Sequence, residues 1–106
     1  MLKITAILLT IGITLPGLAF AAGDAEAGAV KAYTCTGCHG VPGYNNVYPT
    51  YKVPMVGGQH AEYIVAALKA YKNGQRDHKT MASQAASLSD QDMADIAAFF
   101  AGTEQK

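Results

Sequence analysis

The sequence has little of several features on which whole classes of proteins depend. Its 106 residues include two cysteines and no tryptophan, and eight acidic side chains balance eight basic ones. Two cysteines cannot form the multi-bridge framework of a secreted scaffold, nor supply a four-thiolate metal site by themselves. Without a basic excess or a run of Lys and Arg, no surface is predicted to bind nucleic acid or an anionic membrane. We therefore expect no nucleic-acid partner.

The first 22 residues have the pattern of a cleaved export signal. Lys3 precedes an almost wholly apolar run from Ile4 to Phe20, which ends in the small-x-small pattern that signal peptidase recognises. Cleavage is expected after Ala21 or Ala22, leaving one domain over residues 23–106. The alternative is a retained anchor, because about 20 apolar residues span a bilayer. The small residues at the end of the apolar run favour cleavage, so we expect no stable membrane span in the exported chain.

The remaining chain predicts an all-α domain with three helices. Asp24 is a suitable N-cap for a first helix that runs to about Thr34. A second helix is expected from about 60 to 73 and ends at Gly74, and a third follows the N-cap Ser89. Gly28 is expected to mark the point where the first and last helices cross.

Two long irregular segments join these helices in the predicted fold. Residues 40–59 are rich in Gly, Pro and Asn and show no strand-like alternation, and residues 75–88 form a second loop centred on Met81. So small a domain usually needs an additional stabilising link across its core. A disulfide between Cys35 and Cys38 would close too short a loop to supply one.

The most informative motif is Cys35-Thr36-Gly37-Cys38-His39, a C-x-x-C-H at the expected end of the first helix. In this signature two thiols add to the vinyl groups of haem, and the adjacent imidazole becomes an axial iron ligand. Two thiols three residues apart can reach neighbouring substituents of one flat macrocycle. A redox dithiol is expected in a βαβ context, and zinc needs further ligands. The motif therefore predicts one haem c with its iron, attached through Cys35 and Cys38 and ligated by His39.

From Gly23 to Gly102 the chain resembles a class I cytochrome c of the bacterial cytochrome c4 and c553 branch. The resemblance implies a periplasmic protein with the cytochrome c fold, in which three main helices and long loops wrap around one covalent haem. It also implies that the carbonyl of Pro54 accepts a hydrogen bond from the His39 imidazole and tunes it. Cytochrome c4 proteins typically carry two such domains, whereas this sequence has one C-x-x-C-H, so properties of paired haems are not carried over. The matching segments are 23–28, 35–40, 53–60, 74–76 and 88–92, with Tyr63 and Met81.

Met81 is the predicted second axial ligand of the iron. It lies in the irregular segment before the last helix, where a thioether is free to turn toward the haem, and it matches the family position. Met55 and His78 remain alternatives. Met93 is expected in the core because it lies on the apolar stripe of the last helix, and His60 matches a helix start of the family.

Ligation by His39 and Met81 leaves no open position on the iron, which predicts one-electron transfer and no enzymatic activity. The expected partners are redox proteins: a dehydrogenase or cytochrome complex as donor, and an oxidase or reductase as acceptor. One alternative is the cytochrome subunit of a periplasmic dehydrogenase complex, such as a flavocytochrome sulfide dehydrogenase. The others are a haem protein whose Met81 is displaced by a small ligand, and a haem-free dithiol protein.

Overall fold

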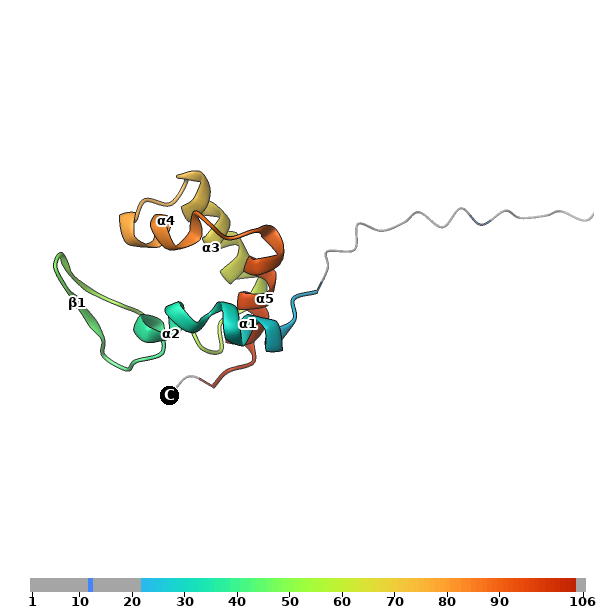
Figure 1. The fold of residues 1–106 in the computed structure, drawn as a ribbon, viewed down its shortest axis with the longest axis horizontal. Coiled ribbons are helices and arrows are strands. Elements are labelled where there is room, and N and C mark those ends of the chain that lie inside the picture. The colour runs from blue at the N-terminus through green and yellow to red at the C-terminus, as the bar shows by residue number, and fades with distance from the viewer. Residues whose placement is uncertain (1–11, 13–21, 105–106) are drawn as a thin grey trace, which may run out of the picture.

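The computed structural model describes residue 12 and residues 22–104, and helices dominate this part of the chain (Figure 1). The predicted export signal lies almost wholly outside the described residues. In the described part, no helix is both long and apolar enough to cross a membrane.

The first predicted helix is interrupted, and its continuation contains the whole C-x-x-C-H motif. Helix α1 (Ala25–Lys31) begins after Asp24, whose Oδ1 accepts hydrogen bonds from two backbone N–H groups, which confirms the predicted N-cap. Helix α2 (Tyr33–His39) follows the cap residue Ala32, so the prediction of one helix ending near Thr34 was wrong. The helical backbone bonds continue through Ala32 from Gly28 to Thr36, because no proline interrupts them.

The segment predicted to be a loop without strands contains a small hairpin. Strands β1 (Asn45–Val47) and β2 (Thr50–Lys52) pair antiparallel, with Asn46 opposite Tyr51. Each strand has three residues, too few to show the alternation that predicts a strand. A backbone bond of 2.9 Å from Val53 N–H to the Tyr44 carbonyl closes the base of this hairpin.

The second predicted loop also contains a helix. Helix α3 (Ala61–Asn73) ends at Gly74, whose φ of 82° confirms the predicted left-handed stop. Helix α4 (Lys79–Ala85) then follows, so Met81 lies on a helix and not in a loop. The N-cap of α4 is His78, which is outside the usual set of Ser, Thr, Asp and Asn and therefore gave no start signal.

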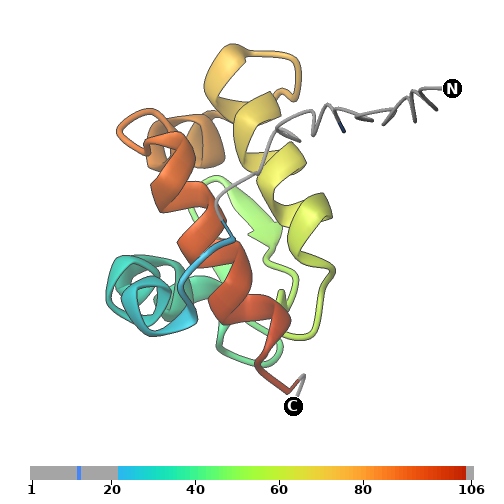
Figure 2. The same cartoon turned by 90° about the vertical axis from the view of Figure 1, so that its right-hand side faces the viewer.

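Helix α5 (Asp90–Ala101) crosses the molecule and packs against both α1 and α3 (Figure 2). Ser89 is its N-cap, as the sequence predicts, and it also forms a capping box with Asp92. Gly28 lies at the crossing with α1, where a Cβ would stand 1.9 Å from the Asp95 carbonyl oxygen, so only glycine fits. The core consists of Ala32, Ile64, Leu68, Ala85, Met93, Ile96, Ala97 and Phe100.

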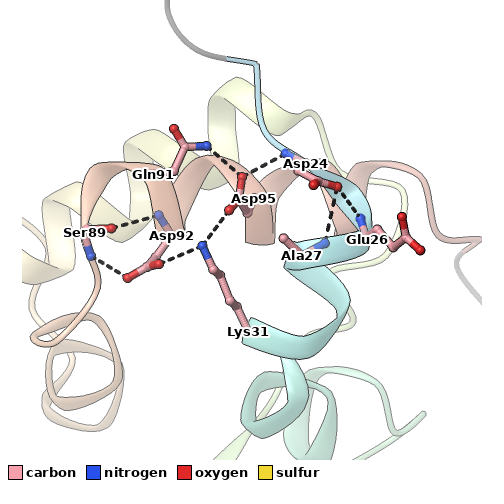
Figure 3. A network of polar contacts seen from close by, with 8 residues as sticks. All are labelled: Asp24, Glu26, Ala27, Lys31, Ser89, Gln91, Asp92 and Asp95. Carbon is pink, nitrogen blue, oxygen red and sulfur yellow. Dashed lines mark hydrogen bonds and ion pairs between the residues drawn. The ribbon is translucent and has the colours of Figure 1, made fainter.

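A polar network on the same pair of helices joins α1 to α5 (Figure 3). The carboxylate of Asp95, which is 3% exposed, accepts hydrogen bonds from the Asp24 backbone N–H at 2.8 Å and from Lys31 Nζ at 2.6 Å. Gln91 Nε2 donates to it at 2.8 Å, and Lys31 also pairs with Asp92 at 2.9 Å. We call these residues, Asp24, Lys31, Gln91, Asp92 and Asp95, the Asp95 network.

Candidate functional site

A largely apolar cavity of about 520 Å³ lies between α2, the hairpin, α3, α4 and α5. Its volume is in the range of pockets that enclose a cofactor. Buried side chains form much of its wall: Ile64 and Leu68 of α3, Ile96 and Phe100 of α5, and Val53 directly after β2. The cavity is therefore continuous with the hydrophobic core of the domain.

Helix α2 brings three residues of the C-x-x-C-H motif to one side of this cavity. Cys35, Cys38 and His39 line it and are each half-buried. Both cysteines lie in the described part of the chain, and no disulfide joins them there. Burial raises the pKa of the Cys35 thiol, whereas a reactive redox dithiol needs a lowered one. This environment does not favour the dithiol alternative.

The His39 ring is oriented by the main chain of the loop after the hairpin. Its Nδ1 lies 2.8 Å from the Pro54 carbonyl oxygen. A carbonyl accepts and cannot donate, so this contact requires the proton on Nδ1 and leaves the lone pair on Nε2. A neutral imidazole in this tautomer is suited to bind a metal through Nε2.

Met81 lines the cavity from α4 and is half-buried. Met55 and His78, the two alternative ligands, line the same cavity. Met93 is fully buried in the core, as the sequence predicts. Among the described residues, His60 is not part of the cavity lining. The geometry thus leaves Met81, Met55 and His78 at the site and removes the other two candidates.

The polar part of the lining contains residues that the sequence did not single out as a site. The Arg76 guanidinium lies 4.8 Å from the centre of the Tyr71 ring, and its Nη1 donates to the Tyr63 hydroxyl at 3.4 Å. Tyr51 of β2 and Thr80 of α4 are joined by a hydrogen bond of 3.0 Å. No local sequence pattern encodes these contacts, and only the folded arrangement reveals them.

The donor set of the cavity fits a haem c. Two thiols with the spacing of the C-x-x-C-H motif, an imidazole with free Nε2 and thioether side chains line one apolar chamber. A metal site built from His, Cys, Asp and Glu alone would need at least three such side chains close together. The described residues contain no such group.

Comparisons with known proteins agree with this chemistry. Residues 25–104 match the family model described as "Cytochrome c". The cytochrome c4 of Pseudomonas aeruginosa is 45% identical over 98 residues, which make up 92% of this chain and 46% of that protein. Cytochrome c-554(548) of Halomonas halodenitrificans is 44% identical over 86 residues, 78% of this chain and 100% of that protein.

A more distant relative is the cytochrome subunit of sulfide dehydrogenase from Chlorobaculum tepidum. It is 30% identical over 79 residues, 74% of this chain and 68% of that protein. The chain spans about half the length of the cytochromes c4 that it matches, and the full length of the cytochrome c-554(548).

Proposed function

The chain belongs to the cytochrome c family, whose members carry covalently bound haem c with its iron, and on this premise we propose that it is a one-electron carrier of the bacterial periplasm. One observation carries the proposal: Cys35, Cys38, His39 and Met81 all line a single apolar cavity. The cytochrome c4 relatives support a transfer protein over an enzyme. The apolar run before residue 23 supports export.

In this proposal each residue of the site has a separate task. Cys35 and Cys38 would hold the haem through thioether bonds, and His39 and Met81 would ligate its iron. Pro54 keeps the Nδ1 proton of His39 in place through its carbonyl, so that Nε2 would be available to bind the iron. When bound, the haem supplies an iron that alternates between the ferric and ferrous states. As a ligand, the Met81 thioether would favour the ferrous state and would raise the reduction potential relative to ligation by two histidines.

Redox proteins are the proposed partners. A carrier has to release each partner quickly, which requires a small and weak interface. Cleavage of the predicted signal removes Lys3 and leaves eight acidic and seven basic side chains, a net charge of −1, so long-range electrostatic steering is weak. We therefore expect its reactions to depend only modestly on ionic strength.

The decisive experiment is spectroscopy of the exported holoprotein with two methionine variants. The unaltered protein is expected to give a low-spin spectrum, the Met–Fe charge-transfer band in the ferric state, and a reversible one-electron redox titration. Met81→Ala should remove that band and allow carbon monoxide to bind the ferrous iron. Met55→Leu, at the same cavity, should retain the band.

Two results would contradict the proposal. Carbon monoxide binding by the unaltered ferrous protein would indicate an open iron, which is typical of a ligand-binding or catalytic haem. Loss of the band in Met55→Leu, with survival in Met81→Ala, would assign the axial bond to Met55.

A second candidate function is the cytochrome subunit of a dehydrogenase complex. The observation that favours it is the 30% identity to the cytochrome subunit of sulfide dehydrogenase of Chlorobaculum tepidum. In that case the exported protein should purify in a stable complex with a flavoprotein. A freely diffusing monomer that reduces an oxidase would exclude it.

A further inference from the structure

Helix α4, which carries Met81, begins in an unusual way. Its N-cap is His78, and the Nδ1 of this imidazole accepts a hydrogen bond from the Met81 backbone N–H at 3.3 Å. The ring thus takes the place of the Ser, Thr, Asp or Asn oxygen that usually caps a helix. The bond is made to the backbone of the same residue whose side chain lines the cavity.

The His78 ring is in turn held by side chains from two other elements. Tyr51 of β2 lies edge-on to it, with ring centres 4.9 Å apart and an interplanar angle of 86°. Tyr71 of α3 lies 6.3 Å away at 74°. The Tyr51 hydroxyl also donates to Thr80 Oγ1 at 3.0 Å, so the hairpin contacts the residues on both sides of Lys79.

Helix α4 depends on such contacts because it has only seven residues, too few to be stable alone in water. Its C-terminal end is fixed in the core, where Ala85 is fully buried. In its first turn Lys79 and Thr80 are exposed, and Met81 is half-buried with its side chain packed against the edge of the core. The contacts of Tyr51 and His78 add to this packing and tie the backbone of the turn to the hairpin.

We propose that Tyr51, His78 and Thr80 form a clasp that ties the hairpin to α4 and positions Met81 as a ligand. The proposal rests on the proposed haem ligation by Met81 and assigns positioning residues to it. Without the clasp, the first turn of α4 moves more freely and Met81 is released from the iron more often. An external ligand then competes more effectively for its place.

Displacement of Met81 by added imidazole in the ferric holoprotein measures this effect directly. His78→Ala removes both the cap and the ring contact, and Tyr51→Phe keeps the ring but removes the bond to Thr80. We expect each variant to bind imidazole more tightly than the unaltered protein, by about fivefold for His78→Ala, the factor expected for one lost helix cap. His78→Asn restores a capping oxygen and should recover part of the difference.

The chain offers a matched control for each variant. His60 is also a histidine at an N-cap, of α3, but its side chain makes no capping bond, so His60→Ala should leave imidazole affinity unchanged. Tyr48→Phe alters a tyrosine at the tip of the same hairpin that is 94% exposed, and it should also have no effect. Gly28→Ala weakens the α1–α5 crossing and tests whether any loss of global stability gives the same result.

The outcomes separate the clasp from the proposed function. If the Met–Fe band depends on Met81 but His78→Ala and Tyr51→Phe bind imidazole like their controls, the clasp is wrong and the carrier function stands. A rise of the same size in Gly28→Ala would also overturn it, because the effect would then follow global stability. If Met81→Ala keeps the band, the ligand assignment fails before the clasp is tested, and the clasp falls with it.

Discussion

At the scale of single residues, the contact between His39 and Pro54 is made by a backbone atom. The carbonyl oxygen of Pro54 lies 2.8 Å from His39 Nδ1, and a substitution of the proline side chain leaves that oxygen in place. The pyrrolidine ring of Pro54 restricts the φ angle of this residue and so reduces the conformational freedom of the unfolded chain. The two contributions of Pro54, to the imidazole and to the loop, can therefore be separated.

Pro54→Ala should retain the spectrum of the unaltered protein while lowering its stability. We expect the Met–Fe band and the reduction potential to stay close to their original values, because the carbonyl is retained. The free energy of unfolding should fall by about 0.4–1 kcal/mol, the usual effect of removing a compatible proline. Denaturant unfolding and a redox titration measure the two effects. A large change in potential without loss of stability would show that the ring, and not the carbonyl, tunes His39.

At the scale of elements, the crossing of α1 and α5 has no room for a side chain on Gly28. A Cβ there would lie 1.9 Å from the Asp95 carbonyl oxygen and 3.0 Å from the Phe99 Cβ. Gly28→Ala should therefore lower the free energy of unfolding by about 2 kcal/mol or more, since overpacking outweighs the gain in helix propensity. Denaturant unfolding of the ferric holoprotein is the measurement.

Gly102→Ala is the matched control for this crossing. Its added methyl would lie 3.6 Å from the nearest atom, the Ala98 carbonyl oxygen, which is an ordinary contact. The two variants should therefore differ clearly in stability. Equal stability of Gly28→Ala and Gly102→Ala would mean that α1 shifts along α5 without cost.

The Asp95 network makes the same crossing sensitive to acid. Hydrogen bonds from Lys31, the Asp24 backbone and Gln91 lower the pKa of Asp95 to about 2. Bonds from Ser89 and Lys31 lower the pKa of Asp92 to about 2 as well. Both values lie below the ordinary 3.8, so the carboxylates stabilise the fold above that pH and lose their contribution as the pH falls toward 2.

Lys31→Met tests this pH dependence. The variant should be less stable than the unaltered protein at neutral pH, and the difference should shrink between about pH 4 and pH 2 as the carboxylates of the unaltered protein become protonated. Denaturant unfolding over this range gives the difference at each pH. Lys69→Met removes the same charge from α3 and should show no such convergence. A difference that stays constant with pH would mean that Lys31 acts through its apolar stem alone.

The elements that the sequence predicted are those with strong local signals. Asp24, Gly74 and Ser89 start or end helices through caps that act within a few residues, so their positions follow from sequence. Helix α4 was missed because its cap is an imidazole held by side chains from α3 and the hairpin. The hairpin was missed because three-residue strands have no readable period.

The candidate site also has a part that the sequence predicted and a part that it did not. The C-x-x-C-H motif has a fixed spacing, and its Cys35, Cys38 and His39 line one cavity with Met81. The pairing of Tyr51 with Thr80 joins residues 29 positions apart, and no local pattern encodes it. Sequence thus predicts the candidate ligands better than the contacts that hold them.

At the scale of the whole molecule, the domain has two sides that depend differently on the haem. On one side, α1 and α5 are joined by the Gly28 crossing and the Asp95 network, which need no cofactor. On the other side, segments 40–59 and 75–88 form part of the wall of the cavity, together with α2, α3 and one face of α5. So small a domain buries a limited core. In the protein without haem, water would fill the cavity, and the apolar side chains that line it would no longer be buried.

Removal of the haem should therefore unfold the two sides unequally. We expect Cys35→Ser/Cys38→Ser, prepared without haem, to lose hydrogen-exchange protection throughout 40–59 and 75–88, because these segments would line a water-filled chamber. The backbone amides where α1 meets α5 should keep measurable protection under mild conditions, since their contacts lie within the two helices. The holoprotein provides the reference for every amide. Uniform loss of protection would mean that the crossing is not a folding unit of its own, and that the haem stabilises the entire domain as one cooperative structure.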